Sequence, residues 1–354
     1  MVGMPLQALD TPALVADLDV VETNLARMAG FFAARPAKLR PHFKNHRVFA
    51  LALRQIKAGA VGIACSRLRQ VAGLSHAGIH NILLTSEIAG ENPLRQWAEL
   101  SREATVIAAV DHPKVVDDMA RIARDTGFPL NVVVDIDLGL KRCGVPGGQA
   151  AAALAQRAVD GGLRFRGVMG YEGHLQLLPP GPEKERAVKQ VLEALVAARG
   201  LIESLGIPVE IVSCGGTGDY TISGAYPGVT ENQPGSFLLM DTGYAPYAPD
   251  FQPALSVLTT VVSKTEGERI VVDAGVKAIS GERGLPSVKG TDALRLRALH
   301  AEHAPIDLVD PNVSIEVGEK IELAVRYHDG TVHLHQQMYG MRKGIIEEVF
   351  TIEH

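Results

Sequence analysis

Eight short apolar runs alternate with amphipathic stretches over the first two thirds of the chain. The runs are 39–44, 61–66, 81–86, 105–110, 130–137, 165–171, 209–215 and 236–241. They are rich in Val, Ile and Ala, and helical patterns such as 113–125, 149–159 and 184–205 separate them. This alternation indicates parallel strands with helices on both faces of the sheet. Eight such units in roughly 200 residues favour a closed (β/α)8 TIM barrel, although the pattern alone leaves an open, doubly wound sheet possible.

The pattern changes after residue 244. Strand-like runs at 254–262, 269–273, 320–324 and 330–334 follow without long helices, and glycines and prolines, including Pro311, separate them. We therefore predict an α/β chain of two domains. A barrel would span residues 15–244, and a mostly-β domain would span 245–354. The N-terminal segment 1–14 would join the second domain, because its strand is surplus to a barrel of eight.

Composition restricts the class of protein and its surroundings. A chain of 354 residues with 46% hydrophobic and 21% charged residues can build a sizeable core. A net charge of −5 argues against a nucleic-acid binder, which would usually be basic. Three cysteines are too few for a disulfide framework, and no apolar run approaches the roughly 20 residues that span a bilayer. Without a basic and then apolar leader at the start, we expect a cytoplasmic protein with no membrane partner.

Lys44 follows the first run and lies between His42 and His46. A lysine that is desolvated among cationic neighbours loses its proton near neutral pH and can attack a carbonyl carbon. On this segment alone, an exposed lysine in a basic turn is the more common situation. The residues that follow the other predicted strands are needed to distinguish a reactive Lys44 from an exposed one.

Further polar groups follow the later runs, where barrel enzymes build their active sites. The glycine-rich loop 215–218 exposes N–H groups that could bind a phosphate, or it is a tight turn without a ligand; it does not match the Walker pattern. Arg142 could meet an anionic or phenolic oxygen, or be structural. Glu172 and His174 lie two apart and would face one side of an extended segment, as acid or base or as structural residues. Together with Lys44, this set is what a pyridoxal phosphate enzyme needs.

The same residues resemble a known family. Over nearly its whole length, the chain resembles the D-threonine aldolase and D-serine dehydratase group of alanine-racemase-type (fold type III) pyridoxal phosphate enzymes. The segments that carry this resemblance are 9–19, 40–46, 142–144, 215–218, 233–236, 240–241, 271–277 and 284–286. The resemblance implies pyridoxal 5'-phosphate as cofactor, a small-molecule amino-acid substrate and a homodimer.

The resemblance also implies roles for individual residues. Lys44 would hold the cofactor as a Schiff base, Arg142 would contact the ring oxygen, and Tyr171 would pack near the ring. Gln233 falls where racemases have an arginine facing the pyridine nitrogen, so the ring need not be protonated. The phosphate would be bound by Gly216, Thr217, Gly235 and Ser236.

A divalent metal that orients the substrate's β-hydroxyl is a further implication. Relatives hold it with a histidine and, two positions on, a cysteine or aspartate. Here His328 and Asp329 are adjacent, so the segment is one residue shorter than the family motif. Imidazole with carboxylate suits Mn²⁺ or Mg²⁺ more than a thiolate-rich Zn²⁺ site. His333 and His335 follow closely in the chain as possible substitute ligands, and loss of the metal is the alternative.

The resulting prediction is a lyase that cleaves D-β-hydroxy-amino acids to glycine and an aldehyde. His46, Glu172 or His174 would take the β-hydroxyl proton. The alternative is a dehydratase in which Lys44 removes the α-proton, and a racemase becomes the stronger prediction if no metal binds. A non-catalytic pyridoxal phosphate carrier resembles the barrel alone, so the second domain argues against it. A barrel without any cofactor would be colourless.

Overall fold

The computed structural model describes residues 1–265, 268–310 and 312–354, so Pro311 lies outside the described residues. The chain forms two compact units. One, called the barrel unit below, comprises residues 27–44 and 49–235; the other, the β unit, comprises residues 1–26, 45–48 and 236–354. The barrel unit ends at residue 235, nine residues before the predicted domain boundary at 244/245. The chain also crosses between the units at the peptide that joins Lys44 to Asn45.

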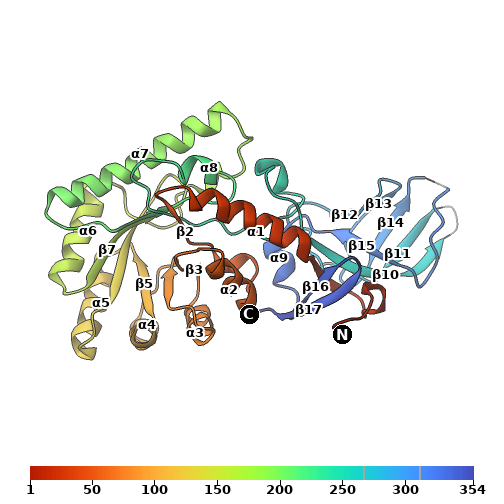
Figure 1. The fold of residues 1–354 in the computed structure, drawn as a ribbon, viewed down its shortest axis with the longest axis horizontal. Coiled ribbons are helices and arrows are strands. Elements are labelled where there is room, and N and C mark those ends of the chain that lie inside the picture. Colours follow the sequence, from red (N-terminus) through yellow and green to blue (C-terminus); the bar gives the residue numbers. More distant parts are fainter. Residues whose placement is uncertain (266–267, 311) are drawn as a thin grey trace. The chain divides into compact units, whose positions relative to one another are not determined.

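Eight parallel strands form the curved sheet of the barrel unit (Figure 1). They are β2 (Lys38–Leu39), β3 (Ile63–Cys65), β4 (Asn81–Leu84), β5 (Thr105–Val110), β6 (Asn131–Ile136), β7 (Arg164–Gly170), β8 (Ile211–Cys214) and β9 (Glu231–Asn232). The ladder runs β2-β9-β8-β7-β6-β5-β4-β3. Its two ends meet through a bridge between His42 and Ala64, and the Ala64 N–H donates to the Pro41 carbonyl at 2.9 Å. The predicted (β/α)8 barrel is therefore confirmed.

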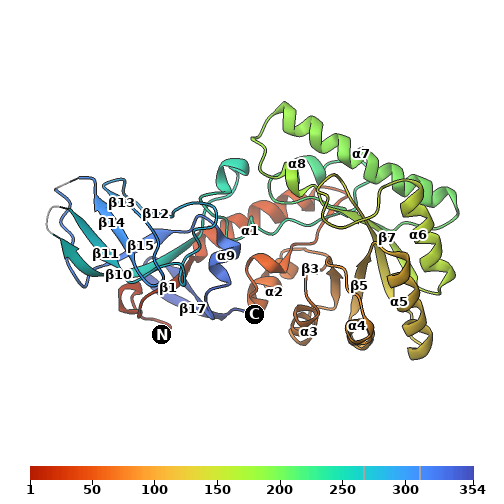
Figure 2. The same ribbon diagram turned by 180° about the vertical axis from the view of Figure 1, so that it is seen from behind.

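Helices follow the strands and cover the outer face of this sheet (Figure 2). They are α2 (Phe49–Lys57), α3 (Leu68–His76), α4 (Glu91–Glu103), α5 (Pro113–Thr126), α6 (Gln149–Asp160), α7 (Pro182–Ser204) and α8 (Tyr220–Ser223). Helix α5 illustrates the local causes. His112 caps it by accepting the Lys114 N–H on Nδ1 at 3.2 Å, proline occupies its first position, and Gly127 ends it with φ at +65°.

The inside of the barrel is layered. The apolar layer consists of Ala64, Leu83, Ile107, Ala109, Val133, Met169 and Ile211. Successive side chains alternate along a strand, so the residue two positions further on faces the same interior. At or just past the carboxyl ends, these residues are Thr85, Asp111, Asp135, Tyr171 and Ser213. A polar layer thus lies above the apolar one, at the end where barrel active sites are built.

The predicted eighth strand at 236–241 is wrong. The last barrel strand is β9, and residues 236–239 form a turn. Phe237 to Met240 are nevertheless fully buried. Periodicity cannot distinguish a short buried turn from a short buried strand, because both read as a continuous apolar run.

A mostly antiparallel sheet forms the β unit. Its strands are β1 (Ala13–Asp17), β10 (Leu255–Thr265), β11 (Arg269–Val272), β12 (Ser287–Val288), β13 (Leu294–Leu296), β14 (Ala304–Leu308), β15 (Lys320–Ala324), β16 (Gln337–Arg342) and β17 (Ile345–Thr351). They run β13-β14-β11-β10-β1-β16-β17, with β15 paired to β10 and β12. Strand β1 lies between β10 and β16, and helix α1 (Leu18–Ala33) follows it. The unit has its own apolar cluster around Leu6, Val15 and Ile346.

One strand predicted for this unit is wrong. The run 330–334 is not extended, because residues His328–Val332 form the short helix α9. The backbone N–H of His328 donates to Asp241 Oδ2 at 2.9 Å and fixes the start of this helix. This tertiary contact overrides the β propensity of the sequence.

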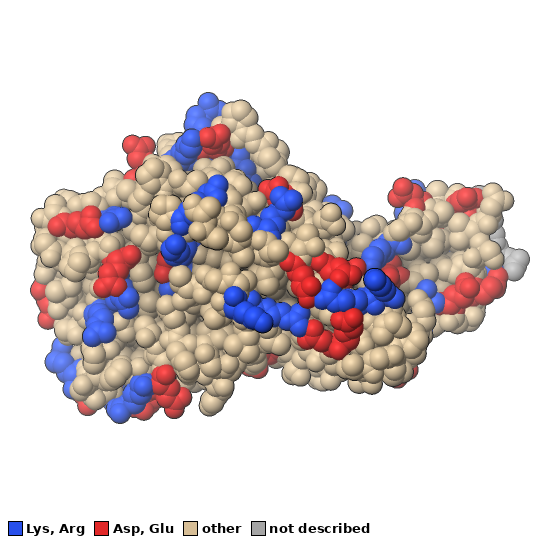
Figure 3. Space-filling view, viewed as in Figure 1, with Lys and Arg blue, Asp and Glu red and all other residues tan. Residues whose placement is uncertain are grey.

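Charged side chains of both signs are interspersed on the face shown in Figure 3. Within the β unit, Arg342 contacts the carboxylates of Asp19, Glu22 and Glu347. In the described part of the chain, no helix has the length and apolar character needed to cross a bilayer.

Candidate active site

Lys44 lies in the barrel unit, in a 3-10 turn (Phe43–Asn45) that follows β2. The neighbouring Phe43 is fully buried and stacks on Phe49 with ring centroids 5.2 Å apart, which anchors the turn. The Lys44 N–H donates to His42 Nδ1 at 3.3 Å. The lysine side chain is partly buried, and its Nζ lies over the Tyr171 ring, 5.9 Å from the centroid.

Arg142 approaches the same ring. Its guanidinium carbon lies 5.6 Å from the Tyr171 centroid. The loop that carries it is folded back by Asp137, whose Oδ1 accepts the N–H groups of Gly139 at 2.9 Å and Lys141 at 3.0 Å. The barrel unit therefore brings Lys44, Arg142 and Tyr171 together around one aromatic ring.

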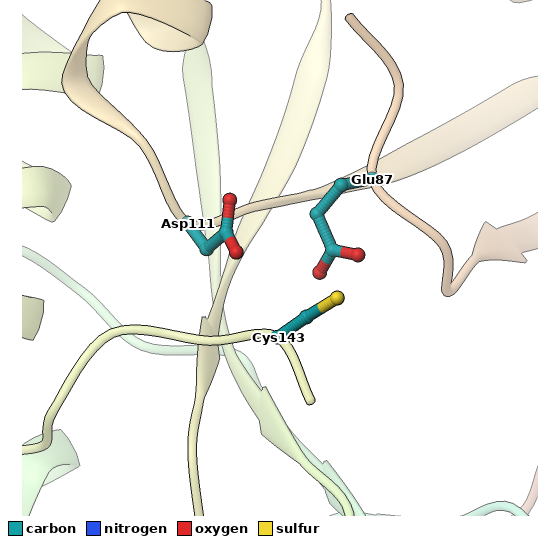
Figure 4. A group of neighbouring side chains, drawn as sticks. All are labelled: Glu87, Asp111 and Cys143. Atoms are coloured by element: carbon teal, nitrogen blue, oxygen red, sulfur yellow. The ribbon is translucent and has the colours of Figure 1, made fainter. Parts of the chain in front are cut away.

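Two acidic side chains lie close to Cys143, which follows Arg142 in the chain (Figure 4). Carboxylate oxygens of Glu87 and Asp111 and the sulfur of Cys143 lie within 4.8 Å of one another. Burial, followed by the charge of Glu87, raises the pKa of Asp135 to about 8. Burial, followed by the hydrogen bond with Glu87, raises the pKa of Cys143 to about 11. The positive charge of Arg142 opposes both shifts. Arg142 is therefore close enough to Asp135 and Cys143 for its charge to affect both groups.

The glycine loop 215–218 follows β8 and is held from one side by buried side chains. The N–H of Gly215 donates to Glu172 at 3.3 Å and that of Gly216 to Asp219 at 2.9 Å. The N–H of Gly218 donates to the Gln176 carbonyl oxygen at 2.9 Å. Three of the N–H groups considered for phosphate are therefore already bonded within the protein. Phosphate binding by Gly216 and Thr217 stays a prediction.

Gln233 follows β9 in the barrel unit. Its N–H donates to the Cys214 carbonyl, and its side-chain Nε2 donates to Ser213 Oγ, each at 2.9 Å. The amide is thereby fixed in the polar layer. Gly235 belongs to the same unit, whereas Ser236 is the first residue of the following segment of the β unit.

Glu172 and His174 do not share one side, contrary to prediction. Residues Gly173–Leu175 form a 3-10 turn and are not extended. Glu172 is fully buried, whereas His174 is exposed, with its ring next to Gly139. The period of two that the prediction assumed does not apply in a 3-10 turn.

The predicted metal ligands converge within the β unit. The side chains of these adjacent residues point the same way, with His328 Nε2 and Asp329 Oδ1 3.7 Å apart. Asn45 Nδ2 lies between them, 3.0 Å from Nε2 and 2.8 Å from Oδ1. On the other side of the ring, Asp241 Oδ2 lies 2.5 Å from His328 Nδ1. A carboxylate on Nδ1 orients the ring so that Nε2 faces the ligand position, as is usual for metal-binding histidines.

The charges around His328 affect its protonation. Burial by itself lowers the pKa of His328, but the charges of Asp329 and Asp241 outweigh it and raise the pKa above its ordinary value. Burial likewise opposes the lowered pKa of Asp241, which results from its hydrogen bond to His328 and from the charge of that ring. A metal would therefore compete with a proton for Nε2.

The other β-unit predictions are placed as follows. Asn45 Nδ2 also donates to Ser236 Oγ, at 3.4 Å. His46 is fully buried, and its Nδ1 accepts the Val48 N–H at 3.1 Å. His333 contacts the Arg47 guanidinium at 2.8 Å. His333 thus lies against a cation.

Four site residues escape prediction from the sequence. Asn45 and Asp241 lie within segments of the family resemblance, but the resemblance assigns them no role. Asp219 and Gln176 reveal themselves only through the folded loop that they support. The one local signal is that Asp219 follows Gly216 by three residues, a spacing at which a carboxylate can accept a backbone N–H.

Comparisons with known proteins cover nearly the whole chain and point to one family. The alanine racemase N-terminal domain family matches residues 16–243, and a putative serine dehydratase domain matches residues 254–341. A D-threonine aldolase of an Arthrobacter species is 32% identical over 99% of this chain and 94% of its own length. The structure of D-threonine aldolase from Filomicrobium marinum gives a TM-score of 0.95 with 31% identity, covering 99% of this chain and 97% of that one. A cysteine-to-alanine mutant of D-threo-3-hydroxyaspartate dehydratase, in the metal-free form, gives 0.87 with 27% identity and 99% coverage of both chains.

Proposed function

Because the chain belongs to the alanine-racemase-type family that includes D-threonine aldolase, we propose that it is a pyridoxal phosphate-dependent lyase of D-β-hydroxy-amino acids. The products would be glycine and an aldehyde. The observation that carries the proposal is the convergence of Lys44 and Arg142 on the ring of Tyr171 at the carboxyl end of the barrel.

The chemistry of these groups fits the cofactor. An amine can bond the aldehyde carbon, a guanidinium can donate to the phenolic oxygen, and an aromatic ring can pack against the pyridine. Gln233 is held by Ser213 and carries no charge, so it places neither a cation nor a carboxylate at the ring nitrogen. Gly216, Thr217, Gly235 and Ser236 are the positions proposed for the phosphate.

The bound cofactor would withdraw electrons from the bond that breaks. The rest of the work falls to the side chains. Lys44 would provide the attachment point, and the positive charge of Arg142 would stabilise the phenolic oxygen of the bound cofactor. Tyr171 limits the movement of the ring. In this arrangement the cofactor and substrate are oriented before any bond changes.

We extend the proposal to a divalent metal at His328 and Asp329. The two ligand atoms face one point, and Asp241 supports the imidazole from behind. Asn45 Nδ2 occupies that point, so metal binding requires this amide to turn away. A carboxylate with an imidazole suits Mn²⁺ or Mg²⁺, and Zn²⁺ is also compatible. The metal would hold the substrate's β-hydroxyl and make its proton more acidic.

For the base that takes this proton we propose His174. It is exposed within the barrel unit, whereas Glu172 and His46 are fully buried. A general base must reach the proton that it removes, and accessibility is therefore the first requirement. Replacing His174 by glutamine would lower the rate of cleavage roughly 10²- to 10⁴-fold, as loss of general-base catalysis does.

The proposed activity is tested by a product assay on D-threonine, with and without added Mn²⁺. Glycine and acetaldehyde in equal amounts are expected. The products 2-oxobutyrate and ammonia would instead identify a dehydratase, and L-allothreonine, formed by inversion at the α-carbon alone, would identify a racemase. Lys44→Ala must abolish turnover. Lys57→Ala is the matched control, because Lys57 is exposed on α2. Cleavage that persists undiminished in Lys44→Ala would contradict the proposal.

The remaining expectations concern assembly and location. The family resemblance supports a homodimer, which sedimentation of the purified protein would test; a monomer at micromolar concentration would refute it. The structure leaves Cys65, Cys143 and Cys214 as free thiols. Free thiols suit a reducing compartment, and we therefore propose a cytoplasmic enzyme.

A further inference from the structure

Two buried carboxyl groups lie directly beneath the glycine loop. Glu172 is fully buried and Asp219 is 1% exposed. They accept the N–H groups of Gly215 and Gly216, and no solvent reaches them to shield their charges. A loop proposed to bind a phosphate dianion thus rests on two acids, which would repel that dianion if both were ionised.

The hydrogen bonding indicates that ionising both Glu172 and Asp219 would be energetically unfavourable. If they were, Glu172 Oε1 and Asp219 Oδ2 would be buried without a partner among the described residues. The two side chains are close enough to form a hydrogen bond with each other once one of them carries a proton. A single proton between them satisfies both oxygens, as in other carboxyl pairs that share a site.

The surroundings decide which group keeps the proton. Asp219 accepts from the Gly216 N–H at 2.9 Å and from the Ser223 hydroxyl at 3.3 Å, so its anion is stabilised. Glu172 receives a longer bond from Gly215. Burial, and then the charge of Asp219, raise the pKa of Glu172 well above its usual range. The proton therefore belongs on Glu172.

Two other titratable groups face the pair. Lys184 of α7 is buried, donates to the carbonyls of Gln176 at 2.8 Å and Leu178 at 3.1 Å, and lies near enough to Asp219 to stabilise its charge. The Cys214 thiol of β8 is fully buried beside both acids, and its pKa is raised well above normal by burial and by their charges. Of these two groups, Lys184 can offset the negative charge of one carboxylate, and the Cys214 thiol cannot offset the charge of a second.

We infer that Glu172 and Asp219 are positioning residues for the glycine loop, sharing one proton so that the layer beneath it carries one negative charge instead of two. This inference rests on the proposed function, because the loop is the proposed phosphate site. It also excludes Glu172 as the general base, since a protonated acid cannot accept a proton. Its role is to hold the Gly215 N–H and to donate to Asp219.

Glutamine is the discriminating substitution. In Glu172→Gln the amide can donate to Asp219 while its oxygen accepts the Gly215 N–H, as the protonated acid does. The affinity for pyridoxal phosphate, measured by absorbance titration, should change less than about threefold. Glu172→Ala leaves buried groups unsatisfied and should weaken binding roughly 5- to 150-fold. Glu193→Gln on the exposed side of α7 is the matched control.

The pH dependence separates proton sharing from mere packing. At alkaline pH the wild-type pair loses its proton, and cofactor affinity should fall. Glu172→Gln has no such proton and should lack this alkaline fall. Lys184, Cys214, Lys44 and the cofactor itself titrate in both proteins, so the difference between the two profiles isolates the shared proton. Equal alkaline falls, or a glutamine variant as weak as the alanine variant, would overturn the inference.

A spectroscopic measurement tests the proton without any cofactor. The infrared difference between wild type and Glu172→Gln, near neutral pH, should show the C=O stretch of one protonated carboxylic acid, which the control variant retains. A difference spectrum containing only a carboxylate band would overturn proton sharing. If the wild type binds no pyridoxal phosphate, the proposed function fails, and the infrared result still decides the state of Glu172.

Discussion

A buried ion pair ties the strand before Lys44 to the rest of the barrel. Arg40, 1% exposed, follows β2, and its Nε and Nη2 donate to the two carboxylate oxygens of Glu231 in β9 at 2.7 and 2.6 Å. Its Nη1 donates to Asn81 Oδ1 of β4 at 3.0 Å. One guanidinium thus links three strands at the point where the barrel closes. We predict that Glu231→Gln destabilises the protein strongly.

The magnitude follows from the geometry. At an effective dielectric constant near 20, two charges about 4 Å apart attract by about 4 kcal/mol. Breaking a buried pair by removing one partner typically costs about 3–5 kcal/mol, because the remaining charge stays buried without compensation. Glu231→Gln should therefore lower the free energy of unfolding by about 3–5 kcal/mol. Replacing both partners by apolar residues, in Arg40→Met with Glu231→Leu, should cost less than the single change.

Urea unfolding followed by circular dichroism measures this loss. The matched control is Asp117→Asn, which breaks an exposed pair with Arg157 of the same two-pronged geometry, both bonds 2.6 Å long. That change should leave the unfolding midpoint in place. A loss below about 1 kcal/mol in Glu231→Gln would refute the reasoning, because it would mean that Arg40 remains solvated or finds another partner.

Three further predictions concern the loop and the metal ligands. The folded state keeps a proton on Glu172 that the unfolded chain releases above the ordinary pKa of a glutamate, so the stability of the wild type declines as pH rises towards the raised pKa. Glu172→Gln lacks this proton, and its melting temperature relative to wild type should therefore rise from acid to neutral pH. A difference in melting temperature that stays constant with pH would contradict this. Gly215→Ala should unfold at a lower urea concentration than Gly59→Ala. Both glycines have positive φ (+82° and +102°), but a Cβ at Gly215 would lie 2.0 Å from an asparagine amide nitrogen, whereas a Cβ at Gly59 would meet open space. Equal unfolding midpoints would contradict the packing argument. Asp241→Asn should weaken Mn²⁺ binding 10- to 100-fold in calorimetry by releasing the His328 ring, and unchanged affinity would place the metal elsewhere.

Much of the barrel could be predicted because its signal is local. The strand at 105–110 was predicted with the boundaries that β5 has, since a Val- and Ala-rich run between two helical patterns has few other interpretations. The predicted strands were wrong where burial or a tertiary contact, and not the local sequence, decides the secondary structure. The turn at 236–239 is buried like a strand, and α9 forms because Asp241 anchors His328.

The site divides in the same way. Lys44 and Arg142 were identifiable because they follow strands of a predicted barrel, where catalytic groups collect. Glu172 was identified as a candidate, but its pairing with Asp219 was not, because that pairing depends on burial and on contact between the two side chains. A sequence shows which residues can ionise, but solvent exclusion decides which of them do.

The central claim is that Lys44 is the residue to which pyridoxal phosphate attaches. Its most direct test is to reconstitute the protein with the cofactor, reduce it with borohydride and map the modified peptide by mass spectrometry. A pyridoxyl group on Lys44, absent after Lys44→Ala and unaffected by Lys57→Ala, is the predicted result. Modification of a different lysine, or none while the protein still cleaves D-threonine, would contradict the account.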